Sequence, residues 1–271
     1  MSLMRIALRI AAVEAIKGRT LVGNNVLDTP NGALDIQADG SLRTEEDKPF
    51  ISVYTDQAKA ENVTGRSLTE NGLCDIIFEM GISSAMLEVD QDTEETVLVG
   101  INIPGSDRNR EFFLDIVQRQ LSEALTDPGN GWAEIFRALH YSIVKIEFAG
   151  ARNTDDGQRL AGHQMRLTVH LADEPVRGVP LDPKSAFMLF LDAMDASADA
   201  SYVKQAQLMR GLVTGAGEDW EGLQRQNGMT AAELLALGQG PLAADVERST
   251  PPAARGTIEI ENLNAATVAN P

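Results

Sequence analysis

Four stretches of the chain alternate apolar and polar residues with a period of two, and this pattern limits the fold more than any other feature. They span residues 73–87, 97–103, 142–149 and 165–172. Successive side chains of a β-strand point to opposite faces, so each stretch predicts a strand with one face against a core. The first two stretches are joined by an acidic turn at 90–95 and predict an antiparallel hairpin.

A fifth strand and several helices complete the expected architecture. β-forming residues behind a proline predict a strand at 50–56, and apolar spacing predicts helices over 1–17, 108–125 and around 132–139. The expected apolar stripe of the long helix is Phe112, Phe113, Ile116, Val117, Leu121, Ala124 and Leu125. We therefore expect an α+β fold, in which helices pack on an antiparallel sheet of four to five strands, plus a C-terminal, mainly helical extension.

The pattern of the chain changes near Pro175, after which only helical periodicity remains. This change predicts three parts: a core over 1–176, a helical extension over 177–248 and a loosely packed tail over 249–271. Because the core looks closed without the extension, we expect the extension on the outside of any assembly. Its deletion is then expected to leave the assembly intact.

Two long polar segments interrupt the predicted strands, at 56–67 and at 150–162. Compact domains rarely contain such connections, and long ones are usually functional or disordered. Segments without a core of their own become ordered when they bury surface on a neighbour, so we interpret both as contacts between subunits. For the second segment, an exposed and salt-bridged loop tip is the alternative. The candidate contact residues are Asp56, Lys59, Glu61, Arg66, Arg152, Asp155, Asp156 and Arg159.

The composition limits the kinds of partner. The formal net charge is −17, whereas surfaces that bind duplex DNA concentrate lysine and arginine. Such a charge favours solubility, and it also lets nucleic acid pass a surface without sticking. Cys74 is the single cysteine, so no intramolecular disulfide is expected. No segment has the apolar length of a membrane span or of a signal peptide, so we expect assembly in a cytoplasm.

Residues that usually carry catalysis are sparse and scattered. The three histidines, His140, His163 and His170, fit no metal-binding spacing, and no phosphate loop or nucleophile elbow occurs. The acidic turn at 90–95 resembles part of a calcium loop, but it lacks the glycine and the distal glutamate of that loop. We therefore expect no catalytic, cofactor-binding or metal-binding residues, and a protein that is not an enzyme.

The order of the elements resembles the tail terminator family of long-tailed bacteriophages, which are minor tail proteins that complete the tail. The resemblance rests on the helix 4–17, the strand 49–54 and the arm after it, the pair 73–86 and 97–103, the helix 110–125, and the strands 142–149 and 165–172 around their Asp-rich loop. It covers the predicted core and does not extend to the helical part.

This resemblance implies a homo-oligomeric ring, hexameric in the family, at the tail–neck junction of the virion. The ring would cap the tail tube, end polymerisation of the tail tube protein and provide a docking face for the head–tail connector or stopper protein. DNA would pass through its lumen without specific binding, and no membrane would be involved.

Three other interpretations stay open at the level of sequence. The chain is another neck component, such as a stopper or head-completion protein, or it is a soluble oligomer without a role in a phage. In the third interpretation it is a small α/β enzyme whose dispersed carboxylates meet in one site. A cluster of Asp75, Glu79 and His170 on one sheet face would favour the enzyme.

Overall fold

The computed structural model divides the chain into two compact units, Met1–Gly228 and Met229–Pro271. The residues that it describes are 2–30, 35–36, 42–43, 48–61, 63, 65–83, 87–89, 96–98, 106–153, 160–214, 219–239, 255–258 and 266–269. Each unit is described by itself.

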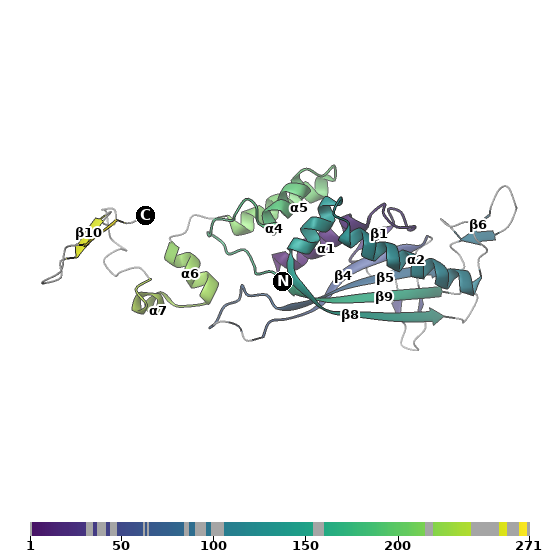
Figure 1. Ribbon diagram of the computed structural model, residues 1–271, viewed down its shortest axis with the longest axis horizontal. Coiled ribbons are helices and arrows are strands. Elements are labelled where there is room, and N and C mark those ends of the chain that lie inside the picture. Colours follow the sequence, from purple (N-terminus) through teal and green to yellow (C-terminus); the bar gives the residue numbers. More distant parts are fainter. Residues whose placement is uncertain are drawn as a thin grey trace. The chain divides into compact units, whose positions relative to one another are not determined.

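A five-stranded sheet runs through the first unit (Figure 1). In spatial order its strands are β1 (Val26–Asp28), β4 (Phe50–Lys59), β5 (Leu73–Ser83), β9 (Leu160–Leu171) and β8 (His140–Asn153). Neighbouring strands are antiparallel except β1 and β4, which are parallel. The predicted α+β class is confirmed, and the sheet is mixed because the short β1 adds a parallel edge.

The predicted hairpin between 73–87 and 97–103 forms only in part. β6 (Leu87–Val89) and β7 (Thr96–Leu98) make a separate two-stranded sheet, as do β2 (Asp35–Ile36) and β3 (Leu42–Arg43). β5 instead lies between β4 and β9. Ile77 is as buried as its neighbours Ile76 and Phe78, so the centre of β5 is apolar on both faces, which suits a central strand.

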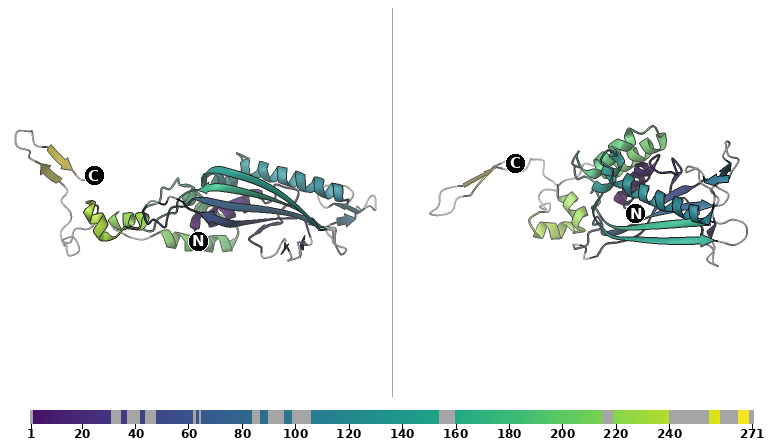
Figure 2. Two further views of the ribbon diagram at one scale, coloured as in Figure 1. Left: turned by 90° about the horizontal axis from the view of Figure 1, so that it is seen from below. Right: turned by 45° about the vertical axis from the view of Figure 1, so that its right-hand side comes forward.

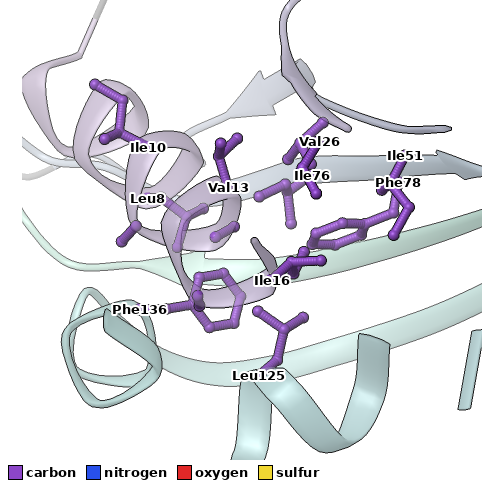
Figure 3. Close-up of a cluster of buried hydrophobic side chains, with 14 of the residues drawn as sticks. Leu8, Ile10, Val13, Ile16, Val26, Ile51, Ile76, Phe78, Leu125 and Phe136 are labelled. Carbon is purple, nitrogen blue, oxygen red and sulfur yellow. The ribbon is translucent and has the colours of Figure 1, made fainter. Parts of the chain in front are cut away.

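The helices α1 and α2 lie on the same side of the sheet, as the right-hand view of Figure 2 shows. α1 (Leu3–Ile16) contacts β1 and β4, and α2 (Asp107–Thr126) contacts β5 and β9. The alternating residues of β5 that were expected to face a core, Cys74, Ile76, Phe78, Met80 and Ile82, are at most 1% exposed. Figure 3 shows Leu8 and Ile16 of α1 in the same cluster as Ile76 and Phe78.

The helix α1 is buried on almost all sides, and its N-terminus is capped twice. The Ser2 hydroxyl accepts a hydrogen bond from the Arg5 amide at 3.2 Å. The Glu174 carboxylate accepts hydrogen bonds from the amides of Leu3 and Met4 at 2.9 and 3.1 Å. A negative charge at this position complements the helix dipole, so the segment after β9 fixes the start of the chain.

The long helix α2 matches its predicted range within one residue at each end. Its Ser106 cap accepts a hydrogen bond from the Asn109 amide. Most of the predicted stripe is confirmed, but Phe112 is 52% exposed while Phe113 is buried. Each helical residue turns the side chain by about 100°, so two adjacent phenylalanines do not share one face.

The helical segment after β9 belongs to the first unit, which corrects the predicted division at 176. α4 (Ala186–Asp195) contacts α1 and α3 (Gly131–Ala138), and α5 (Ala200–Val213) packs on α4. Phe187, Phe190, Leu191 and Met194 are at most 3% exposed. Phe190 meets Trp132 of α3 edge-to-face, with 6.3 Å between ring centroids. The expected extension is therefore core as far as α5, and the division lies at Gly228.

The remaining elements are short. α6 (Asp219–Asn227) ends the first unit, and the second unit contains α7 (Ala231–Ala236), β10 (Arg255–Ile258) and β11 (Ala266–Ala269). Thr230 and Glu233 cap α7 reciprocally in a capping box. β10 and β11 form an antiparallel pair. Among the described helices, none has the length and apolar character that crossing a bilayer requires.

Candidate assembly surface

The strand β8 is an edge of the main sheet and is exposed along most of its length. It pairs with β9 on one side and has no second neighbour in the order of the described strands (Figure 1). Every residue from Tyr141 to Gly150 is exposed. Five large apolar side chains, which we call the β8 patch, are 46–65% exposed: Tyr141, Ile143, Val144, Ile146 and Phe148.

Two register shifts explain part of this exposure. They fall between His140 and Ser142 and between Ile143 and Lys145. Each leaves one residue, Tyr141 or Val144, without a regular partner on β9. Bulges bend a strand and re-aim its side chains, and they are common at sheet edges.

The position of the helices explains the remaining exposure of the β8 patch. Ile146 and Phe148 pair with Leu167 and Met165, which are buried on the helical side of the sheet. These two β8 residues therefore also point to the helical side, but α2 lies over β5 and β9. The described helices leave the middle of β8 uncovered, so apolar side chains that belong to a core face meet solvent.

The opposite face of the sheet carries a hydrogen-bonded group of polar side chains around Glu79, next to the buried Ile77. The Glu79 carboxylate accepts hydrogen bonds from Tyr54 Oη at 2.7 Å, Gln164 Nε2 at 3.0 Å and Ser52 Oγ at 3.3 Å. Burial raises the pKa of Tyr54 well above its ordinary value, and the hydrogen bond to Glu79 adds to the shift. Both effects favour the protonated phenol, which can donate to the carboxylate.

The three residues that would favour an enzyme share this face but form no cluster. Asp75 accepts a hydrogen bond from Thr168 Oγ1 at 2.6 Å and lies 3.7 Å from Arg166. His170 lies edge-on to Tyr141, with 5.6 Å between ring centroids. Asp75 and Glu79 are four residues apart on one strand, so their backbones are separated by about 13 Å. Each carboxylate has its own partners, and they do not converge on one reacting atom.

The first polar segment begins later than the sequence predicts. β4 continues to Lys59 after an irregularity between Thr55 and Ala58, so Asp56 and Lys59 are strand residues. The Asp56 carbonyl accepts a hydrogen bond from Arg5 Nη2 at 2.7 Å, and its carboxylate is 3.9 Å from Arg166.

The other predicted contact residues are exposed or lie outside the description. Lys59 Nζ is 2.5 Å from Glu61 Oε1, and Arg66 lies in an exposed turn beside Gly65. The backbone of Arg152 belongs to β8, but its side chain is not described. Asp155, Asp156 and Arg159 lie outside the described residues.

The alternation over 142–149 predicts an ordinary half-buried strand and does not predict the β8 patch. Its signal is the pair Ile143-Val144, two adjacent apolar residues that break the alternation at the second register shift. A strand with apolar residues on both faces is either central or a contact surface.

One group of possible metal ligands was also missed. Glu111 and Asp115 of α2 approach His163 of β9, and their ligand atoms all lie within 4.8 Å of one another. These residues are far apart in the sequence and form no recognisable spacing.

Comparison with known proteins adds no assignment, because neither the known family models nor the curated proteins contain a match to this chain.

Proposed function

We propose that the chain is a structural subunit of a homo-oligomeric ring that caps the tail tube of a long-tailed bacteriophage. In this function it ends polymerisation of the tail tube protein and presents a docking face to the head–tail connector. The proposal combines the element order of the predicted tail-terminator resemblance with the exposed apolar edge strand of the fold.

The β8 patch is the observation that carries the proposal. An exposed, long and apolar edge strand invites pairing with another chain. Natural proteins blunt such edges with charges, prolines, bulges or short strands, and β8 keeps five exposed apolar side chains beside its two register shifts and the pair Lys145 and Glu147. Covering each half-exposed apolar side chain contributes roughly 1 kcal/mol. Five such side chains on one strand therefore suit a contact that forms in the working state of the protein.

A closed ring requires a head-to-tail contact, in which β8 of one copy meets a different surface of the next. β-Augmentation supplies a mechanism, because the unpaired backbone groups of an edge strand extend a sheet across the contact. The charge of −17 suits a lumen through which DNA passes without specific binding. The location in the virion, at the tail–neck junction, follows from the same proposal.

The first test is light scattering on a size-exclusion column, with negative-stain images of the same peak, over a range of protein concentrations. We expect a ring with a central hole. Phe148→Ser is expected to raise the concentration needed for ring formation at least about five-fold, since it removes roughly 1 kcal/mol or more at each contact. Phe112→Ser is the matched control, because Phe112 is 52% exposed on α2 and lies outside the β8 patch.

Two outcomes contradict the proposal. A chain that stays monomeric or forms a closed dimer, even with tail tube protein present, has no ring. A ring that forms equally well with Phe148→Ser does not use the β8 patch.

A second measurement separates a terminator from other neck rings. Purified rings are added to polymerising tail tube protein, and the tube lengths are measured by electron microscopy. A terminator gives shorter tubes with rings at their ends, whereas a stopper or head-completion protein leaves the tube length unchanged. A soluble oligomer without a phage role binds neither partner.

A further inference from the structure

The helix α5 presents two exposed leucines one turn apart. Leu208 and Leu212, which we call the α5 leucine pair, are 68% and 54% exposed. Their spacing of four residues places them on one side of the helix. The buried side of α5, which carries Ala206, Met209 and Val213, packs on α4. The leucine pair therefore forms an apolar helix face that the described part of the first unit leaves largely exposed.

The uncovered part of β8 is the counterpart of this face, because it is an apolar sheet surface without a described helix over it. Ile146 and Phe148 point to the helical side and are 50% and 60% exposed. Within one chain α5 packs on α4 and lies apart from β8, in Figure 1 and in the right-hand view of Figure 2. A contact between α5 and β8 therefore requires a second copy, and it is head-to-tail because two different surfaces meet.

The apolar side chains of the two surfaces have matching spacings. Four residues of an α-helix rise about 6 Å along its axis. Two residues of a strand advance about 6.6 Å. When the helix runs along the strand, the α5 leucine pair thus rests on Ile146 and Phe148 at the same time.

A pair of opposite charges continues this spacing by one step. Lys204 is exposed on α5, one turn before the leucine pair. On the sheet, Gly150 lies two residues beyond Phe148 and pairs with His163 of β9. His163 Nδ1 is 3.9 Å from Asp115 Oδ1 of α2. Asp115 therefore lies at the level that Lys204 reaches when the leucine pair covers the strand.

The Asp115 side chain is 62% exposed and lies on the flank of α2 toward β8. Gln120 is about 140° away around the helix and accepts a hydrogen bond from the Leu21 amide at 2.8 Å, on the flank toward α1. α5 contains Lys204 and Arg210 and no acidic residue, although the chain has a net charge of −17. Opposite charges across a contact fix its register and orientation.

We propose that α5 of one copy lies along the helical face of β8 of the next copy, with the α5 leucine pair over Ile146 and Phe148. Lys204 then lies beside Asp115, and the helix runs antiparallel to β8. This inference rests on the proposed ring and names the surface that meets β8 in it. α5 becomes part of the contact, in contrast to the expectation that the helical extension lies outside the assembly.

Cross-linking between full-length copies tests which surfaces meet. Phe148→Cys chains are mixed with affinity-tagged Leu208→Cys chains and treated with a short bismaleimide. The native Cys74 is 1% exposed and is not expected to react. We expect a cross-linked pair that contains one chain of each kind, identified by its mass. Leu189→Cys, at an exposed leucine of α4, replaces Leu208→Cys in the control and is expected to give no such pair.

Substitutions test the energy of the same contact by light scattering. Leu208→Ser is expected to raise the concentration needed for ring formation at least about five-fold, and Leu189→Ser is expected to leave it unchanged. Lys204→Glu and Asp115→Lys each place like charges together and are expected to raise it by a similar factor. The double variant with both reversals is expected to form rings nearly as well as the wild type, because the charge pair is restored.

Three outcomes contradict the inference, and they separate it from the proposed function. A ring that Phe148→Ser weakens but Leu208→Ser and Lys204→Glu do not weaken keeps the β8 patch and excludes α5 as its partner. Cross-links between two Phe148→Cys chains alone indicate a closed dimer through β8. A chain that stays monomeric at every concentration, with tail tube protein present, excludes both the ring and this contact.

Discussion

β9 and β8 are adjacent in the same sheet, similar in length and similar in sequence pattern, but they differ in what covers them. Met165, Leu167 and Val169 of β9 are at most 4% exposed beneath the helices. Their partners on β8 include Ile146 and Phe148, which are at least half exposed. An alternating pattern thus predicts that a strand has an apolar face, while the element that covers this face is decided by the rest of the fold or by another chain.

The largest expected effect comes from deleting α4 and α5, which cover apolar surface of the first unit. Truncation after residue 176 removes α4 and α5 and exposes apolar surface of α1 and α3. We expect this variant to be unfolded or aggregated, because several buried aromatic and aliphatic contacts are lost at once. Truncation after Gly228 is expected to change the melting temperature of the first unit by less than about 2 °C.

Circular dichroism during heating measures both truncations. A well-folded protein ending at 176, with a cooperative transition, would restore the predicted domain boundary and contradict a core that includes α4 and α5.

The next largest effect is the difference between replacing a phenylalanine at the centre of the sheet and replacing one at its edge. Phe78→Ala in β5 is expected to lower the free energy of unfolding by about 3–5 kcal/mol, since the phenylalanine is fully buried. Phe148→Ala in β8 is expected to change the free energy of unfolding by no more than about 0.5 kcal/mol in the monomer, because the phenyl group of Phe148 is already largely in water.

Urea denaturation gives both values, at protein concentrations below those that form rings. Similar losses for the two variants would mean that β8 is covered within one chain, and the β8 patch would no longer be available to a partner.

A smaller effect concerns the polar face of the sheet. Removal of the hydroxyl by Tyr54→Phe is expected to cost about 1 kcal/mol, because Glu79 loses one of its three hydrogen bonds. The folded pKa of Tyr54 is raised above the unfolded value of about 10, so the unfolded chain loses this proton first as the pH rises.

This contribution to stability is therefore complete below pH 10 and declines above it. Urea denaturation between pH 8 and about pH 11 tests it. The wild type is expected to lose stability above pH 10 more steeply than Tyr54→Phe, and equal slopes would contradict the shifted pKa.

The sequence supports prediction of local structure better than prediction of what lies beside it. The face of β5 and the ends of α2 follow from residue spacing alone, because burial of Ile76 and Phe78 repeats with the period of the strand. The parallel edge β1 has three residues and no pattern, so turn signals around it concealed the strand. Phe190 and Trp132 meet across 58 residues of chain, and His163 meets Glu111 across 52. No local sequence pattern predicts contacts between residues so far apart in the chain.

The smallest expected effect is at the exposed pair of β8. Lys145 Nζ is 2.8 Å from Glu147 Oε1, and the hydrogen bond from Lys145 lowers the pKa of Glu147. Both groups are in water, where the attraction is screened, so Glu147→Gln is expected to leave the stability of the monomer unchanged in urea denaturation. In the ring the same substitution is expected to change the salt dependence of assembly, because a contact along β8 removes water from the pair. Light scattering at low and high salt compares it with Glu123→Gln on α2. Identical salt dependence for wild type and Glu147→Gln would mean that the contact does not include this part of β8.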